Sequence, residues 1–228
     1  MTLEHKTRTD IPYAGLHVLA DDDPRWPIDP IRQAQRALQG GARVIQLRTK
    51  HATDRQTLVW ADTIRAMTRD AGARFVVNDR FDLALASKAD AVHLGQDDLA
   101  PADLPSDARA RLAIGRSTHD PDQAKRALTE GIAYLAYGPL FGTQSKVTPY
   151  DPRGLERLGE IAALAKASAP SLPIVVIGGM THENIHLALA RGATGAAVIS
   201  AVAAAEKPAD ATAQLVACFD TPHGQEAS

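Results

Sequence analysis

The sequence has 228 residues, with 25 Lys and Arg against 27 Asp and Glu, so its formal net charge is −2. Hydrophobic residues make up 45% and charged residues 23%, a composition that excludes an intrinsically disordered chain. The balanced charge and the 4% aromatic content argue against a protein whose main partner is nucleic acid or an acidic membrane.

The N-terminus mixes acids and bases and lacks the apolar segment of a signal peptide. The longest apolar stretch, Ala196–Ala205, is about half of the ~18 residues that a membrane span needs. Cys218 is the only cysteine, which excludes an intramolecular disulfide. We therefore expect a cytoplasmic protein.

Short β-branched segments alternate with longer helix-like segments eight times along the chain. The predicted strands are Leu16–Ala20, Val44–Arg48, Phe75–Asn78, Ala91–Leu94, Leu112–Gly115, Tyr134–Tyr137, Ile174–Ile177 and Ala196–Ile199. The predicted helices lie near Ile31–Gln39, Asp54–Asp70, Phe81–Ser87, Pro121–Thr129, Gly154–Ala167 and Asn184–Arg191, with a shorter connection over Pro101–Arg111 and a last helix from Ala201 to about Phe219.

Strands that alternate with helices are expected to be parallel and joined by crossovers. Eight such units without a leftover block predict an α/β protein, a single-domain TIM (β/α)₈ barrel, with an open eight-stranded sheet as the alternative. We expect the barrel to span residues 13–220, with residues 1–12 and 221–228 as tails. Active-site residues of such barrels lie at the carboxyl ends of the strands, and polar clusters follow seven of the eight predicted strands.

The second predicted strand carries two cations. Gln46, Arg48 and Lys50 are two residues apart, so they share one face of an extended chain, while Ile45 and Leu47 share the other. Interior cations are costly unless an anion neutralises them, so this face predicts a multiply charged anionic ligand. The alternative is a strand that frays into a solvated loop at Thr49.

Two acids follow the third and fourth predicted strands. Asp79 and Asp98 come after strands that lie ~4.8 Å apart in a parallel sheet, so they can share one hard cation. Mg²⁺ binds proteins through one or two carboxylates plus substrate phosphates, which suits a diphosphate held opposite Arg48 and Lys50. The alternative is that each acid caps the helix that follows it.

A second anion site is expected on the far side of the barrel. Gly178 and Gly179 end the seventh predicted strand and Ser200 follows the eighth, where many barrels bind a phosphate. The polar segment Gly142–Pro152 follows the sixth strand and is expected to close over a ligand, unless it is a plain surface loop.

One motif imitates a zinc site. His182-Glu183-Asn184-Ile185-His186 matches H-E-x-x-H, with Glu206 as a conceivable third ligand. Thr181 is predicted to cap the helix, which places His182 and Glu183 in its first, exposed turn. Zinc chemistry is therefore not expected. His17, His93 and His119 lie near strands and are interpreted as structural, with His119 as the one whose catalytic role stays open.

Six spaced motifs resemble those of thiamine-phosphate synthases and occur in the same order from about Gly15 to Val202. They are Gln46–Lys50, Asn78–Arg80, His93–Leu99, Ser117–His119, Gly138–Phe141 with Thr143–Lys146, and Ile177–Met180. The resemblance implies a (β/α)₈ transferase that joins a hydroxymethylpyrimidine diphosphate to a thiazole phosphate and releases pyrophosphate. In that family the pyrophosphate is viewed as leaving before the thiazole nitrogen attacks.

The resemblance also implies roles for individual residues. The pyrimidine diphosphate is assigned to Gln46, Leu47, Arg48, Thr49, Lys50, Asn78, Ser117 and Lys146, of which Arg48, Ser117 and Lys146 are also assigned to catalysis. The thiazole phosphate is assigned to Thr143, Gln144, Ser145, Gly179, Ile199 and Ser200. Asp79 and Asp98 are implied to hold Mg²⁺. The expected partners are these small molecules, not nucleic acid or membrane, and an assembly of identical chains is left open.

The sequence departs from the family pattern at a few positions. Thr49 stands where the family often has Glu, Ser145 where it has Thr, Gly142 where it has Pro, and Val147 where it has a second Lys. Arg116-Ser117 and Gly179–Thr181 are similar to the related thiazole tautomerases, in which His119 would transfer a proton. A tautomerase-like isomerase and a non-catalytic, regulatory thiazole-phosphate-binding relative are therefore the alternatives.

Overall fold

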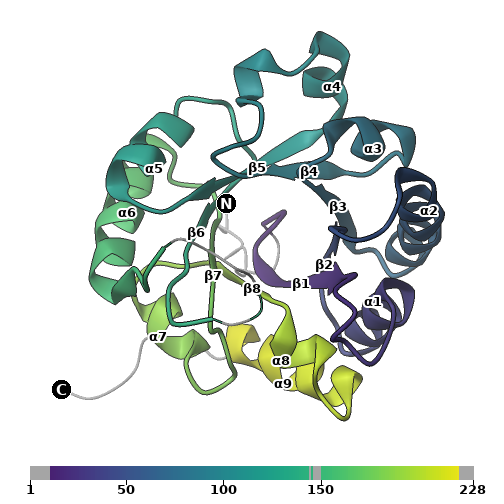
Figure 1. The fold of residues 1–228 in the computed structure, drawn as a ribbon. Coiled ribbons are helices and arrows are strands. Elements are labelled where there is room, and N and C mark those ends of the chain that lie inside the picture. The colour runs from purple at the N-terminus through teal and green to yellow at the C-terminus, as the bar shows by residue number, and fades with distance from the viewer. Residues whose placement is uncertain (1–10, 144, 146–149, 221–228) are drawn as a thin grey trace, which may run out of the picture.

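The structure is a computed structural model that describes residues 11–143, 145 and 150–220. Eight parallel strands close into a barrel in chain order, and helices surround it (Figure 1). The strands are β1 (Gly15–Asp21), β2 (Val44–Arg48), β3 (Arg74–Asn78), β4 (Ala91–Leu94), β5 (Ala113–Thr118), β6 (Tyr134–Tyr137), β7 (Ile174–Ile177) and β8 (Gly195–Val198). The predicted single-domain (β/α)₈ barrel is confirmed, and the open sheet is excluded because β1 pairs with β8.

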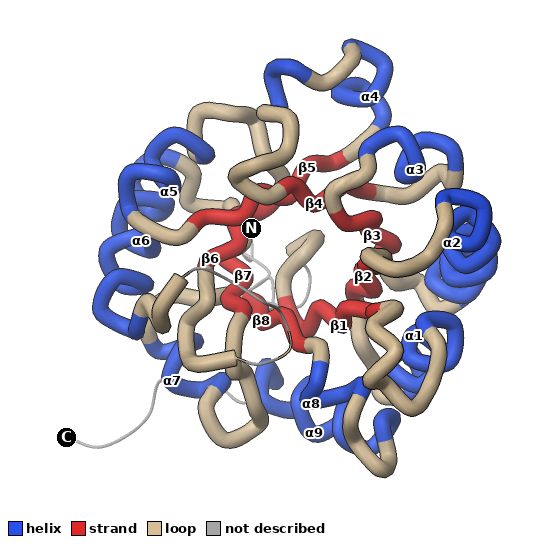
Figure 2. Tube along the Cα trace, in the orientation of Figure 1, coloured by secondary structure: helices blue, strands red, loops and turns tan. Residues whose placement is uncertain are grey.

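The helices form the outer ring of the barrel (Figure 2). They are α1 (Pro30–Gln39), α2 (Asp54–Asp70), α3 (Phe81–Ala86), α4 (Ser106–Arg111), α5 (Pro121–Ala127), α6 (Gly154–Ser168), α7 (Ile185–Ala190), α8 (Ser200–Ala203) and α9 (Pro208–Asp220), with a 3₁₀ turn at Pro101–Asp103. Apart from residues 11 and 12, the predicted tails lie outside the described residues, as do the predicted site residues Gln144 and Lys146, so the predicted tail boundaries stay a prediction.

Local sequence signals explain where several helices begin. The Asp29 side chain accepts a hydrogen bond from the Arg32 amide, and Pro30 occupies the first helical position of α1. Asp120 and Pro121 repeat this arrangement at α5. Each cap satisfies an amide that has no partner within its helix.

Two predicted boundaries are wrong. The helix expected from Ala201 to Phe219 is divided into α8 and α9, because Pro208 has no amide hydrogen to continue a helix and instead begins the second one. Strand β5 extends to Thr118, three residues beyond its predicted end, since its pairing with β6 continues through Thr118 and Tyr137.

Alternate residues of each strand face two different cores. Ile45 and Leu47 pack with the helices in the outer layer, whereas Val44 and Leu19 belong to the cluster inside the barrel. The predicted division of β2 into two faces is therefore confirmed. Parallel strands also send every strand-to-helix loop to the same end of the barrel, which is the end that carries the cavity described below.

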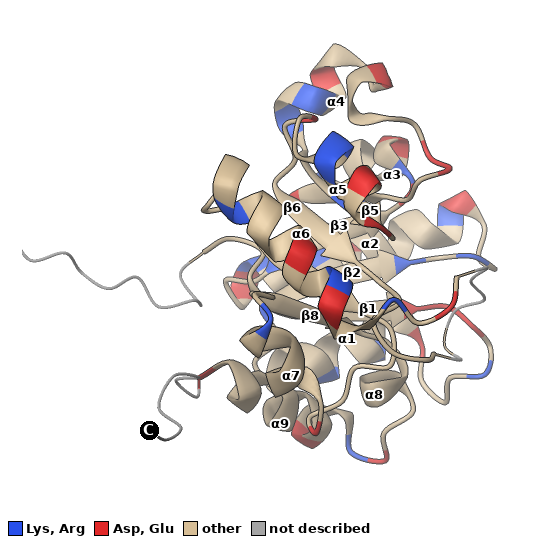
Figure 3. Ribbon diagram, turned by 90° about the vertical axis from the view of Figure 1, so that its left-hand side faces the viewer, with Lys and Arg blue, Asp and Glu red and all other residues tan. Residues whose placement is uncertain are grey.

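The outer surface carries mixed charge. Lys and Arg are interspersed with Asp and Glu around the helices (Figure 3). Within the described residues, no helix has both the length and the apolarity to cross a membrane.

Candidate active site

A cavity of about 280 Å³ opens at the carboxyl ends of the strands. Each of the eight strands, or the loop after it, contributes to its wall. The predicted site residues that line it are Gln46, Arg48, Asn78, Asp79, Ser117, Thr143, Ser145, Gly179, Ile199 and Ser200. Residues that are more than 150 positions apart in the sequence, such as Gln46 and Ser200, thus meet in one site, as the barrel topology requires.

Four described site residues do not line this cavity. Leu47 is 1% exposed and packs in the outer layer, so its side chain points away from the mouth. Thr49 bonds to Thr57 at the start of α2. Lys50 and Asp98 lie at the rim, where Lys50 Nζ is 2.5 Å from Asp79 Oδ2 and Asp98 lines a second hollow together with Asp79.

Aromatic side chains form the floor of the cavity. The Tyr134 ring lies 5.6 Å from the His93 ring, nearly parallel to it, and 5.2 Å from the His17 ring, which meets it edge-on. The ring of Tyr134 occupies the space opposite Gly115, where a Cβ atom would lie 2.1 Å from it. Burial lowers the pKa of His17 to about 4, so this ring of the floor is uncharged at neutral pH.

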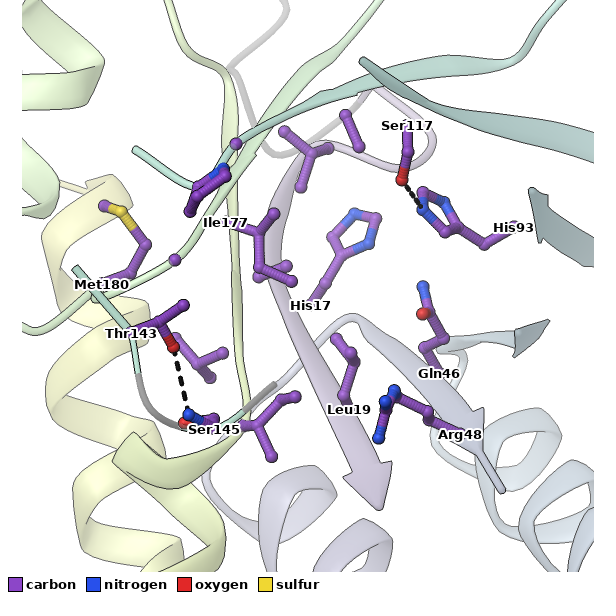
Figure 4. A pocket seen from close by; sticks show the side chains of 18 of the residues that line it. His17, Leu19, Gln46, Arg48, His93, Ser117, Thr143, Ser145, Ile177 and Met180 are labelled. Atoms are coloured by element: carbon purple, nitrogen blue, oxygen red, sulfur yellow. Dashed lines mark hydrogen bonds between the residues drawn. The ribbon is translucent and has the colours of Figure 1, made fainter. Parts of the chain in front are cut away.

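A hydrogen-bonded chain links this floor to the cavity wall. His93 Nδ1 is 2.9 Å from the Tyr134 hydroxyl, and His93 Nε2 is 2.8 Å from Ser117 Oγ (Figure 4). The interpretation of His93 as a purely structural residue is incomplete, because its ring lines the cavity and fixes Ser117. The alternation of side chains along β4 could have indicated that His93 faces the inside of the barrel, since Ala91 does so and His93 is two residues later.

An ion pair closes the wall between β1 and β2. Arg48 Nη1 is 2.5 Å from Asp21 Oδ2, and the Asp21 side chain is fully buried. Polar clusters are predicted after the other seven strands but not after β1. Asp21 nevertheless ends β1, and Asp22 and Asp23 follow it. This run of acids was the signal that could have shown it.

The two predicted metal ligands are neighbours. Asp79 has a positive φ of 64°, which is rare for a residue other than glycine and marks local backbone strain. Asp98 Oδ2 accepts the Gly95 amide at 2.7 Å. Burial and the charge of Asp79 raise the pKa of Asp98. The capping alternative is wrong, because α3 follows Arg80 without a side-chain cap and Asp98 bonds within its own loop.

The opposite side of the mouth is built from glycines and hydroxyls. Gly178 and Gly179 both have positive φ, and a Cβ atom on Gly179 would lie 2.4 Å from the Gly142 carbonyl oxygen. Only glycine therefore fits between these two loops. Ser145 donates from its hydroxyl to Ser200 Oγ at 2.7 Å, which joins the β6 loop to the start of α8.

His119 takes part in anchoring the loop after β6. Its ring stacks on Tyr150 with centroids 3.9 Å apart, and the Arg153 guanidinium lies over the Tyr150 ring, 4.6 Å from its centroid. His119 Nδ1 also lies 2.5 Å from the Gly138 carbonyl oxygen. These contacts fix the return of the loop against the end of β5.

The H-E-x-x-H motif does not form a single helical face. His182 and Glu183 lie in an exposed turn, and α7 begins at Ile185 with Asn184 before it, so the predicted cap at Thr181 is wrong. The cause is Asn184, whose side chain accepts the Thr181 amide and closes the turn one residue before the helix. Within residues 11–143, 145 and 150–220, no three His, Cys, Asp or Glu side chains gather as metal ligands.

The arrangement can hold two anionic groups on opposite sides of one aromatic floor. Figure 4 shows Gln46, Arg48, His93 and Ser117 on one side, with Thr143, Ser145 and Met180 on the other. The first side offers cations and carboxylates, and the second offers neutral hydrogen-bond donors. Two substrates bound in this way would meet above the floor.

The chain has close counterparts among known proteins. A family model described as thiamine monophosphate synthase matches residues 16–202. A thiamine-phosphate synthase of Chlorobium luteolum is 41% identical over 211 residues, which cover 92% of this chain and 95% of the relative. A thiamine-phosphate synthase of Natronomonas pharaonis is 45% identical over 187 residues, 78% of this chain and 82% of the relative.

One solved structure is similar in both sequence and fold, and a second is similar in fold alone. A thiamine phosphate pyrophosphorylase from Pyrococcus furiosus has a TM-score of 0.78 at 35% identity, and the match covers 91% of this chain and 96% of that one. A Mycobacterium tuberculosis tryptophan synthase chain has a TM-score of 0.68 at 15% identity, covering 90% and 92%, and shares the fold alone.

Proposed function

We propose that this protein couples a hydroxymethylpyrimidine diphosphate to a thiazole phosphate in the cavity at the carboxyl ends of its strands. The chain belongs to the thiamine monophosphate synthase family and is a transferase that forms thiamine phosphate. The single observation that carries this proposal is the division of one cavity into a charged half and a neutral half. The products are thiamine phosphate and pyrophosphate.

The charged half is proposed to bind the pyrimidine diphosphate. Gln46 and Ser117 lie at the floor, where they can hydrogen-bond the pyrimidine, and Asn78 lies beside them in the wall. Arg48 and Lys50 supply the cations for the diphosphate, with Lys146 proposed from the family pattern. Leu47 can take part only through its backbone, because its side chain packs against the helices.

A divalent cation at Asp79 and Asp98 fits the charge of this half. The two carboxylates face one hollow, burial and the charge of Asp79 raise the pKa of Asp98, and Lys50 is paired with Asp79. Mg²⁺ matches two carboxylate ligands plus diphosphate oxygens. Bound there, it would neutralise the diphosphate and stabilise the leaving pyrophosphate. It would also take over the charge of Asp79, which leaves Lys50 available to the diphosphate.

The neutral half is proposed to bind the thiazole phosphate. The hydroxyls of Thr143, Ser145 and Ser200 converge there, and the Gly179 backbone can approach an anion closely because it has no side chain. Ile199 borders the same region, and Gln144 is assigned from the family pattern.

The two halves orient the reacting atoms. The carbon–oxygen bond between the pyrimidine methylene and the diphosphate breaks, and a carbon–nitrogen bond forms to the thiazole nitrogen. Arg48 and Lys146 are proposed to stabilise the charge that develops on the departing pyrophosphate, and Ser117 to hold the pyrimidine ring in place. The aromatic floor and the loop from Gly142 to Pro152 are proposed to exclude water.

The alternative functions have less support. The relatives described above are named as synthases or pyrophosphorylases, and none is named as a tautomerase or a regulatory protein. A tautomerase also has no use for the charged half. His119, its expected proton-transfer residue, is engaged with Tyr150 and the Gly138 carbonyl. The proposed substrates are small and water-soluble, which supports our expectation of a cytoplasmic enzyme.

The experiment is incubation of the protein with both substrates and Mg²⁺, with thiamine phosphate and pyrophosphate measured together. We expect the two products in equal amounts, and no coupling when a chelator replaces Mg²⁺. Full activity in chelator would contradict the metal proposal. Binding of thiazole phosphate without any product would favour the regulatory alternative, and isomerisation of the thiazole alone would favour the tautomerase.

A further inference from the structure

The acidic end of β1 is not among the residues assigned to either substrate. Asp21 is the last residue of β1 and Asp22 follows it, and Asp21 is paired with Arg48 in the register of β1 and β2. We propose that these two carboxylates position the two cations of the charged half, Asp21 through the Arg48 side chain and Asp22 through the backbone at Lys50. This inference rests on the proposed function, since it deepens the diphosphate site.

Asp21 is held rigidly from several directions. Its Oδ1 accepts the Trp26 indole N–H at 2.8 Å and the Asp23 amide at 3.0 Å. Its own backbone N–H donates to Gln33 Oε1 at 2.9 Å, and its carbonyl accepts from Gln33 Nε2 at 2.8 Å. Gln33 is 1% exposed. A carboxylate with this many partners has a fixed orientation.

That orientation decides where the Arg48 guanidinium points. Asp21 Oδ2 binds one of its nitrogens, Nη1, and the Arg48 side chain is only 12% exposed. A guanidinium has five N–H donors in a rigid plane, so binding one edge to a fixed carboxylate directs the others. Arg48 lines the cavity, so its remaining donors are available to an anion there. Asp21 also compensates the cost of keeping this cation in the wall before the ligand arrives.

Asp22 acts on the neighbouring loop. Its Oδ1 accepts the Lys50 amide at 2.7 Å, and its Oδ2 accepts the amides of His51 at 2.9 Å and Ala52 at 2.7 Å. Three consecutive amides on one carboxylate fix the backbone from which the Lys50 side chain extends. The Lys50 ammonium thereby reaches Asp79 across the mouth.

The test compares Asp21→Asn and Asp22→Asn with Asp23→Asn as the matched control. Asp23 pairs at the surface with Arg25, through both the Arg25 amide and its guanidinium. Each variant is assayed for kcat and for the KM of both substrates. The Kd of pyrophosphate is measured by calorimetry in the presence of Mg²⁺, a readout that needs no turnover.

We expect Asp21→Asn and Asp22→Asn to raise the KM of the pyrimidine diphosphate and the Kd of pyrophosphate by about tenfold, because Asp21→Asn removes the charge partner of Arg48 and Asp22→Asn weakens the amide hydrogen bonds that fix the backbone at Lys50. The KM of the thiazole phosphate should stay within about twofold, and Asp23→Asn should match the wild type. Asp21→Asn should add little to Arg48→Gln, because both remove the same interaction.

Equal changes in the KM of both substrates, or additive losses with Arg48→Gln, would overturn the proposal. If Asp21→Asn does not fold, Asp22→Asn and Trp26→Phe decide instead, since both positions are partly exposed and Trp26→Phe removes the indole N–H that donates to Asp21 while keeping an aromatic ring. A wild type that forms no thiamine phosphate would contradict the proposed function. An active wild type, together with Asp21→Asn and Asp22→Asn variants whose KM for the pyrimidine diphosphate and Kd for pyrophosphate are unchanged, would contradict this inference alone.

Discussion

The two halves of the barrel mouth use different chemistry. From β1 to β4, the described wall is a network of opposite charges, with Arg48 on Asp21 and Lys50 on Asp79. From β6 to β8, the residues that line the cavity are glycines, hydroxyls and apolar side chains, including Gly179 and Ser200. The charged half is built from residues in or just after the strands, whereas the neutral half is built from loops that meet one another.

This difference has a physical reason if the proposed substrates are correct. A diphosphate carries more charge than a phosphate monoester, and it must depart with the electron pair of the broken bond, so charge-assisted contacts and a metal ion stabilise it most. A monoester that remains in the product needs to be oriented, which neutral donors and backbone amides achieve without further buried charge.

The largest effect is expected at the metal ligands. Asp79→Asn and Asp98→Asn should each lower the coupling rate by on the order of 100-fold, because each removes one negative charge from a shared cation. The double variant should be little worse than either single variant, since residues that act as a unit give non-additive losses. The measurement is kcat at saturating Mg²⁺ in all three variants.

Asp70→Asn is the matched control for that series. Asp70 is exposed at the end of α2, and its change should leave the rate as in the wild type. If Asp79→Asn and Asp98→Asn both keep near wild-type turnover, the metal clamp is wrong and the charged half loses its central feature.

The buried His17 in the floor between the halves makes a prediction about pH. The pKa of His17 is lowered from 6.5 to about 4 in the folded protein, so the unfolded chain takes up this proton first as the pH falls. The contribution to stability is complete above about pH 6.5 and is lost progressively toward pH 4, by about 3 kcal/mol.

His17→Gln removes this titration and keeps a nitrogen that can donate to the Tyr13 carbonyl. Urea unfolding at about pH 7 and about pH 4.5 should show a smaller loss of unfolding free energy in the variant than in the wild type. The two proteins should respond equally between about pH 7 and pH 8, which serves as the control interval. Equal losses at low pH would show that the floor tolerates a charge.

Placing charge in the neutral half should have a smaller and selective effect. Ser200→Asp puts a carboxylate where the thiazole phosphate is proposed to bind, so the KM of that substrate should rise by about tenfold. The KM of the pyrimidine diphosphate should change by less than about twofold. Ser200→Ala is the control that removes the hydroxyl without adding charge. A raised KM for the pyrimidine diphosphate alone would reverse the assignment of the two halves.

The smallest effect is expected just outside the neutral half. His182 and His186 are exposed on the outer side of the glycine turn. The double variant His182→Ala/His186→Ala should keep kcat and both KM values within about twofold. Loss of activity in a folded variant would make the H-E-x-x-H motif functional and extend the neutral half beyond the cavity.

The alternation of strands and helices was readable from the sequence, because a period of two differs from a period of 3.6 within a few residues. That alternation, and the polar residues at the strand ends, predict the barrel and the location of its mouth. The alternation within β2 also separates Gln46 and Arg48 from Ile45 and Leu47 correctly, since a strand exposes successive side chains to opposite faces.

Tertiary structure alone decided which side chains contact one another. Nothing local indicates that Asp22 binds three amides of the next loop, that Tyr134 fills the space opposite Gly115, or that Ser145 meets Ser200. These pairs are 19 to 55 residues apart in the chain, and their contacts depend on how the closed barrel brings neighbouring strands and loops together. Sequence periodicity specifies the face on which a residue lies, whereas the partner it finds there depends on packing between elements that are distant in sequence.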